Sequence, residues 1–254
     1  MTWKINMLSL AAACFFCNAV MAYSPEAFTN PAAHLEKSYV SSSIPRKIVE
    51  RLPPATVTKP PVRRIKLVLE QTRIDEREKK QVIEFHEEIT LLDNGIVRTN
   101  MQRPDLHFAS YQLSYGNLLP LRSESLKYTK PKQGVVDTKT IAIPRFENFP
   151  PVEGKKAVLS YQQKTFGLPA DPVVTLECMW TGVREARLIA SNLPGKATDF
   201  KCDALDGGKK LQTIAFSYLQ AYGLYIEISS EPAPGMKSYF GRRSNIIRNV
   251  VLIP

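Results

Sequence analysis

Apolar and polar residues alternate along most of this chain, and that alternation leaves few folds open to it. From residue 64 onward, apolar residues recur at every second position, as in strands with one buried face, and helical periodicity is almost absent. Gly, Asn, Asp and Pro separate the alternating segments. We therefore predict an antiparallel all-β fold, either a sandwich of two packed sheets or one strongly curved sheet that forms a half-barrel.

Turn chemistry predicts the register of one hairpin. The predicted strand 81–92 ends at the sequence Asp-Asn-Gly at 93–95, a strong turn signal. A two-residue loop would pair Leu91 with Arg98, whereas a three-residue loop pairs Leu91 with Val97 and keeps apolar residues on one face. We therefore expect a three-residue turn with Gly95 at positive φ. The other predicted strands are 66–74, 107–115, 119–129, 134–143, 155–165, 173–181, 199–204, 210–218, 223–230 and 245–253.

Two cysteines in the predicted strands, Cys178 and Cys202, both fall on the apolar side by alternation. They could be buried free thiols, but an export signal favours a disulfide. The turn signal at 191–195 is not centred between them, so a simple hairpin would not place them opposite each other. The bond then needs a bulge or bend, for which Gly182 is a candidate, or it joins two packed layers.

The N-terminal region has the composition of an exported protein. Residues 1–22 have a basic start, an apolar stretch and small residues before a cleavage site that we place near Ala22; a lipoprotein signal at Cys14 is a weaker alternative. Residues 23–61 form a Pro-rich tail or linker with a short helix at 43–52, and residues 62–254 form the β domain. We expect a periplasmic or secreted protein with no transmembrane segment in the mature chain.

The chain is basic, with a formal net charge of +10. Its basic residues are scattered, and the few clusters lack the interleaved aromatic residues that a single-strand nucleic-acid binder needs. We therefore expect a solvated basic surface and no nucleic-acid partner.

No catalytic or metal-binding motif stands out. Of the three histidines, His34 lies in the predicted tail and His107 begins the apolar face of a strand. His86 shares a strand face with Glu84 and Glu88, but three side chains spread along a flat strand cannot easily gather around one ion. We expect no catalytic residues, no metal and no cofactor.

A resemblance to a protein group supports the β fold. Uncharacterised β-rich proteins of the bacterial envelope share a pattern of cysteines, glycines and aromatic residues with this chain. The matching positions here are Cys178, Gly182, Pro194-Gly195, Phe200, Cys202 and Tyr222-Gly223, together with Gly116, Leu119-Pro120 and Leu121 in the region 113–128. The resemblance covers about half of the mature chain and implies an exported β-rich protein, without a known activity.

These observations favour an exported, non-catalytic β-domain protein that binds an apolar small molecule or an envelope protein. The aromatic residues that could contact a ligand are Tyr111, Tyr115, Trp180, Tyr218, Tyr222 and Tyr225. The alternative is a hydrolase of envelope polymers that uses carboxylates from separate strands, since such a site leaves no local motif.

Overall fold

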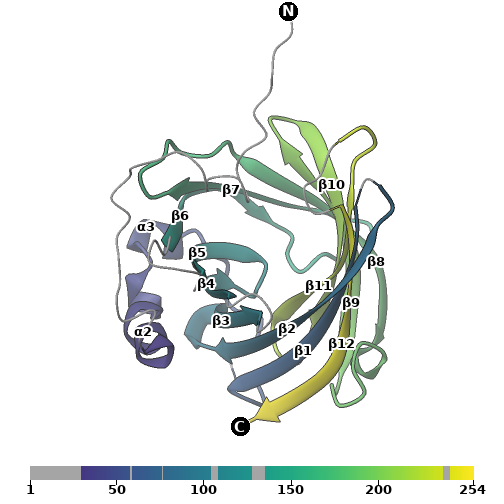
Figure 1. Cartoon of the computed structure of the whole chain (residues 1–254), viewed down its shortest axis with the longest axis horizontal. Coiled ribbons are helices and arrows are strands. Elements are labelled where there is room, and N and C mark those ends of the chain that lie inside the picture. Colours follow the sequence, from purple (N-terminus) through teal and green to yellow (C-terminus); the bar gives the residue numbers. More distant parts are fainter. Residues whose placement is uncertain (1–29, 58, 76, 104–107, 128–134, 237–240) are drawn as a thin grey trace, which may run out of the picture.

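The computed structural model describes residues 30–254, except residues 58, 76, 104–107, 128–134 and 237–240 (Figure 1). The predicted signal peptide, its cleavage near Ala22 and His107 lie outside the described residues. In the part of the chain that is described, no helix combines the length and apolar character needed to span a membrane.

Twelve antiparallel strands of the described chain form one sheet that closes into a barrel. The all-β prediction is therefore confirmed, and of the two predicted architectures the single curved sheet is the one observed. The strands are β1 (Arg64–Ile74), β2 (Lys80–Leu91), β3 (Ile96–Arg103), β4 (Phe108–Tyr115), β5 (Leu119–Lys127), β6 (Val135–Glu147), β7 (Lys156–Thr165), β8 (Val174–Glu185), β9 (Lys196–Asp206), β10 (Lys209–Leu219), β11 (Leu224–Pro232) and β12 (Arg242–Ile253).

Neighbours in the chain are neighbours in the sheet, and β1 pairs with β12 to close the barrel. The β1–β12 ladder runs from Arg64 opposite Ile253 to Ile74 opposite Arg242. By contrast, β11 and β12 share only two pairs, at Ser229 and Ser230. We call this short ladder the β11–β12 seam. The sheet curves further than the predicted half-barrel, but its closure is weakest at the seam.

The turn at 93–95 has the predicted three-residue form. Leu91 lies opposite Val97, and the register then continues along β2 and β3. Gly95 has a φ of 72°, as expected, and the turn is a short 3₁₀ helix, η2 (Asp93–Gly95). The prediction is confirmed because both the turn chemistry and the apolar pattern required this register.

The two cysteines form a disulfide within the sheet, between directly opposite positions of β8 and β9. Their Cα atoms are 3.9 Å apart. A register shift between Trp180 and Gly182 supplies the predicted bulge. The connecting loop is longer than the turn signal indicated: it begins with the 3₁₀ helix η4 (Ala186–Leu188) and ends before Lys196, so its centre lies between the cysteines.

Before the barrel, the chain forms α2 (Pro31–Ser38), η1 (Ser41–Ser43) and α3 (Arg46–Val49). The helix predicted at 43–52 is therefore shorter, and its N-cap residue is Pro45. The sequence reading did not predict α2. Its N-cap, Asn30, accepts a hydrogen bond from the backbone N–H of Ala33 at 3.2 Å.

Residues 30–57, which we call the N-terminal segment, pack on the barrel. In Figure 1 the helices α2 and α3 lie beside β3–β6. Leu35, Tyr39, Ile44 and Ile48 are buried in the same apolar cluster as Tyr111 of β4. This part of the predicted tail therefore belongs to the folded core, because its apolar side chains are removed from water against the sheet.

Candidate ligand-binding cavity

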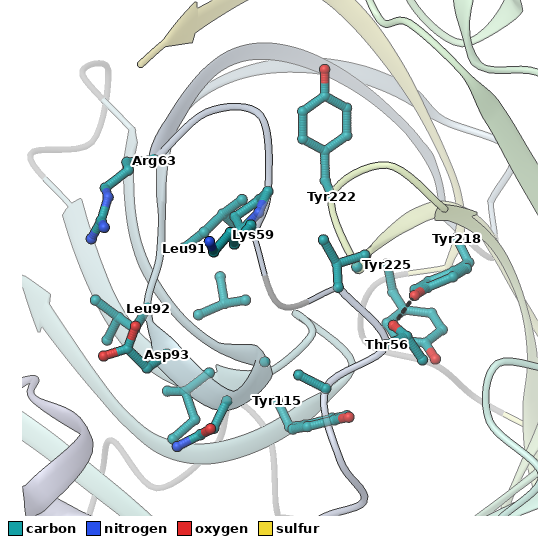
Figure 2. A pocket seen from close by; sticks show the side chains of 18 of the residues that line it. Thr56, Lys59, Arg63, Leu91, Leu92, Asp93, Tyr115, Tyr218, Tyr222 and Tyr225 are labelled. Carbon is teal, nitrogen blue, oxygen red and sulfur yellow. Dashed lines mark hydrogen bonds between the residues drawn. The ribbon is translucent and has the colours of Figure 1, made fainter.

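A cavity of about 330 Å³ opens where the N-terminal segment passes over the turns of the barrel (Figure 2). One part of its wall is aromatic. This part consists of Tyr115, Phe149, Tyr218, Tyr222 and Tyr225. We call it the tyrosine cavity. Its size falls at the lower end of the range typical of small-molecule sites.

The β10–β11 hairpin places two of these rings together. Tyr218 and Tyr225 are opposite residues of the ladder, and their ring centroids are 4.6 Å apart. The backbone N–H of Tyr225 also donates to the carbonyl oxygen of Gly116 at 2.8 Å, which ties the hairpin to the β4–β5 turn. Tyr115, at the end of β4, is brought to the same cavity by that turn. Residues distant in sequence thus converge through the curvature of the sheet.

The N-terminal segment closes one side of the tyrosine cavity. The hydroxyl of Tyr115 donates to the carbonyl oxygen of Pro54 at 3.1 Å. Thr56 and Tyr218 share a hydrogen bond between their hydroxyls, which is drawn in Figure 2. The hydroxyls of Tyr115 and Tyr218 are therefore hydrogen-bonded to a segment that was predicted to be a linker.

The tyrosines of the cavity remain neutral over the physiological range. Burial, together with the neighbouring Tyr218, raises the pKa of Tyr115 to about 12. Burial raises the pKa of Tyr225 even further, with smaller effects from Tyr218 and Tyr115. These rings therefore offer apolar faces and neutral hydroxyl groups rather than charge.

The opposite side of the cavity carries charge. Figure 2 shows Arg63 and Asp93 on the side away from Tyr218 and Tyr225, with Lys59 between the two sides. Lys59 and Arg63 are exposed to solvent, and both line the cavity. The cavity is therefore polarised, with an aromatic wall facing a mainly cationic rim.

The structure divides the six predicted aromatic residues. Tyr115, Tyr218, Tyr222 and Tyr225 line the tyrosine cavity. Two residues lie elsewhere. Tyr111 is fully buried against Tyr39 and His34, and Trp180 sits on β8 opposite Phe200, away from the cavity.

A buried polar cluster that the sequence pattern does not predict lies against α2. The Nε2 atom of His34 lies 2.8 Å from Oε2 of Glu124, and the hydroxyl of Tyr39 donates to the same oxygen at 3.0 Å. His34 and Glu124 are each only 3% exposed. Arg122 approaches the Tyr39 ring and donates to the carbonyl oxygen of Ser38 at 2.9 Å. No local pattern links these residues, because about 90 positions separate His34 from Glu124.

The cavities do not gather carboxylates. Among the described residues that line the tyrosine cavity or the second, smaller cavity beside it, Asp93 is the one acidic residue. Over the described residues, no group of three His, Cys, Asp or Glu side chains is arranged to hold a metal ion. His86 and Glu84 form an exposed pair at 2.8 Å on the outer surface, with side chains 50% and 64% exposed. Among the described residues, neither cavity is therefore lined by a pair of carboxylates.

Comparisons with known proteins add little to this picture. No protein-family model and no curated protein sequence matches the chain. Among solved structures, the chain is similar to a β-barrel-like protein from Brucella abortus that belongs to a domain of unknown function, DUF1849. The match has a TM-score of 0.37 and 7% sequence identity, and it covers 77% of this chain and all of the other. A likeness this distant carries no argument about function.

Proposed function

We propose that this protein is an exported, non-catalytic binding protein that holds a small, largely apolar ligand in the tyrosine cavity. The observation that carries this proposal is the convergence of four tyrosines and Phe149 on one cavity at the junction of the barrel and the N-terminal segment. Aromatic walls with few polar groups are typical of small-molecule sites. The disulfide fits export, since such bonds persist in oxidising compartments.

A neutral apolar dye tests the proposal directly. N-phenyl-1-naphthylamine fluoresces strongly only when it leaves water, so titrating it into the folded protein reports occupancy of an apolar site. We expect saturable binding with about one site per chain. Native mass spectrometry of protein purified without detergent should also show bound mass. No saturable binding and no bound mass would refute the proposal.

A cavity-filling variant assigns the binding to this site. Ala55 lines the cavity, and Ala55→Trp should fill part of it and weaken dye binding about tenfold or more. Ala170→Trp is the matched control, because Ala170 is exposed and does not line either cavity. Both variants should keep the thermal midpoint of the parent within a few degrees. Equal dye binding by the two variants would place the ligand elsewhere.

Export is tested separately. The full chain, produced in a Gram-negative bacterium, should appear in the periplasmic fraction with Tyr23 as its first residue. Retention of residues 1–22 in the cytoplasm would contradict this part of the proposal.

A further inference from the structure

A second cavity lies beside the tyrosine cavity. Its volume is about 280 Å³, and its lining includes Tyr39 and Arg98. The two cavities share four lining residues, Arg63, Leu91, Leu92 and Asp93, so each lies against the same stretch of wall. Arg63 therefore lines both cavities.

The residues that line the two cavities, taken together, carry more positive than negative charge. Lys59, Arg63 and Arg98 line the two cavities, against a single acidic residue, Asp93. Within the described part of the chain, none of these three cations forms an ion pair with a carboxylate; the Arg98 guanidinium donates instead to the carbonyl oxygen of Leu35, at 3.4 Å. The neighbouring Arg64, in contrast, lies 3.5 Å from Glu88.

The backbone holds Arg63 in place independently of its side chain. Its N–H donates to the carbonyl oxygen of Ile253 at 3.0 Å, and its carbonyl oxygen accepts from the N–H of Leu91 at 2.9 Å. The guanidinium is therefore presented from a fixed point beside the cavity while its charge remains uncompensated by a carboxylate. Such a cation can bind a carboxylate, sulfonate or phosphate oxygen through charge-assisted hydrogen bonds.

We propose that the natural ligand is an amphipathic anion, whose apolar part lies against the tyrosines and whose anionic group is bound by Arg63 and Lys59. This inference rests on the proposed function and adds the chemical class of the ligand. Arg63 lies on the opposite side of the view from Tyr218 and Tyr225, with Lys59 between them (Figure 2), which matches a molecule with one apolar and one negatively charged end.

Two dyes with one skeleton test this assignment. N-phenyl-1-naphthylamine is neutral, and 8-anilino-1-naphthalenesulfonate carries a sulfonate on the same ring system. We expect the anionic dye to bind about tenfold more tightly than the neutral dye at low salt. Added sodium chloride should weaken the binding of the anionic dye alone, since ions screen exposed charges.

Variants identify the cations. Arg63→Gln and Lys59→Gln should each weaken the anionic dye severalfold, and together about tenfold, while neutral-dye affinity stays within twofold of the parent. Arg64→Gln is the matched control and should change neither affinity, because Arg64 lines neither cavity. Equal affinity of the parent for both dyes, or equal losses for both dyes in the Arg63 and Lys59 variants, would overturn the inference and leave the apolar site intact. Binding of neither dye would instead refute the proposed function itself.

Discussion

At Glu124 one carboxylate oxygen accepts hydrogen bonds from two residues of the N-terminal segment, His34 and Tyr39. All three side chains are buried, and burial together with Glu124 raises the pKa of Tyr39 well above its usual value. Burying a carboxylate without hydrogen-bond partners would be strongly unfavourable, so the barrel and the N-terminal segment stabilise each other through this contact. Glu124 fixes the N-terminal segment on the barrel, and the segment satisfies Glu124.

Removing the acceptor tests this anchor. Glu124→Ala should lower the free energy of unfolding by about 3 kcal/mol, because two buried donors lose their partner. Trypsin should also cut the variant faster at Arg46 and Lys47, whose backbone lies in the released segment. Equilibrium urea unfolding and timed proteolysis measure the two effects.

An exposed Glu–His pair on the surface, Glu84 with His86, provides the control for Glu124→Ala. Glu84→Ala removes a carboxylate at the same 2.8 Å from a histidine, but in an exposed position, and should cost less than about 0.5 kcal/mol. Similar losses for the Glu84 and Glu124 variants would show that the buried cluster contributes nothing beyond a surface pair.

Glu87 makes the stability of the protein depend on pH. Burial raises the pKa of Glu87 from 4.5 to about 7 in the folded protein. Between these two values the unfolded chain has already lost the proton that the folded protein retains, so stability falls as the pH rises through this window and is lowest above pH 7. Glu87→Gln should therefore raise the urea midpoint at pH 8 and leave it nearly unchanged at pH 4.5. If Glu87→Gln did not raise the urea midpoint at pH 8, the raised pKa of Glu87 would be contradicted. Glu88→Gln is the control: the Glu88 carboxylate pairs with Lys66, so this variant should not raise the midpoint.

At the scale of elements, the β8–β9 hairpin combines a bulge, a long loop and a cross-strand disulfide. The bulge between Trp180 and Gly182 shifts the register by one position, so that Cys178 and Cys202 are opposite while the loop still closes. The bridge joins residues 24 positions apart in sequence. In the chain-entropy account it therefore acts mainly by limiting the unfolded chain.

Its removal should be measurable. The double variant Cys178→Ala/Cys202→Ala should unfold with a free energy about 3.5 kcal/mol below that of the oxidised parent. The parent treated with dithiothreitol should show a comparable loss, since the same bond is absent. If the reductant left the parent's urea midpoint unchanged, the thiols would not be bridged in solution.

At the scale of the whole molecule, the barrel is closed by ladders of very unequal length. The β1–β12 ladder extends over both strands, whereas the β11–β12 seam has two pairs. Backbone amide hydrogens that have no hydrogen-bond partner on a neighbouring strand exchange with solvent more readily. The seam is therefore the place where the barrel opens most easily.

Amide hydrogen exchange can detect this difference. Along residues 245–253 of β12, amides that point to β1 should be protected, whereas the alternate amides that point toward β11 should exchange at least tenfold faster. In β9, which has long ladders on both sides, both sets should be protected. Uniform protection along β12 would mean that β11 and β12 pair over their full length.

Local chemistry alone determined much of this protein. Most strand positions and the three-residue turn with Gly95 at positive φ could be predicted, because alternation and turn preferences depend on near neighbours. The pairing of Cys178 with Cys202 could be predicted because they are the two cysteines that follow the predicted signal peptide. Four of the predicted aromatic residues, Tyr115, Tyr218, Tyr222 and Tyr225, do line the cavity, although Tyr222 lies in the turn between β10 and β11 rather than in a strand.

Only the tertiary structure decided the rest. Closure of β1 on β12, burial of His34 against Glu124 and the meeting of Arg63 with Tyr225 across one cavity each join residues that lie far apart in the chain. No short-range period encodes such contacts, because they depend on how strongly the sheet curves and on which segment covers it. The N-terminal segment shows this most clearly: its composition is that of a linker, and its place in the core follows from the apolar surface that the barrel presents to it.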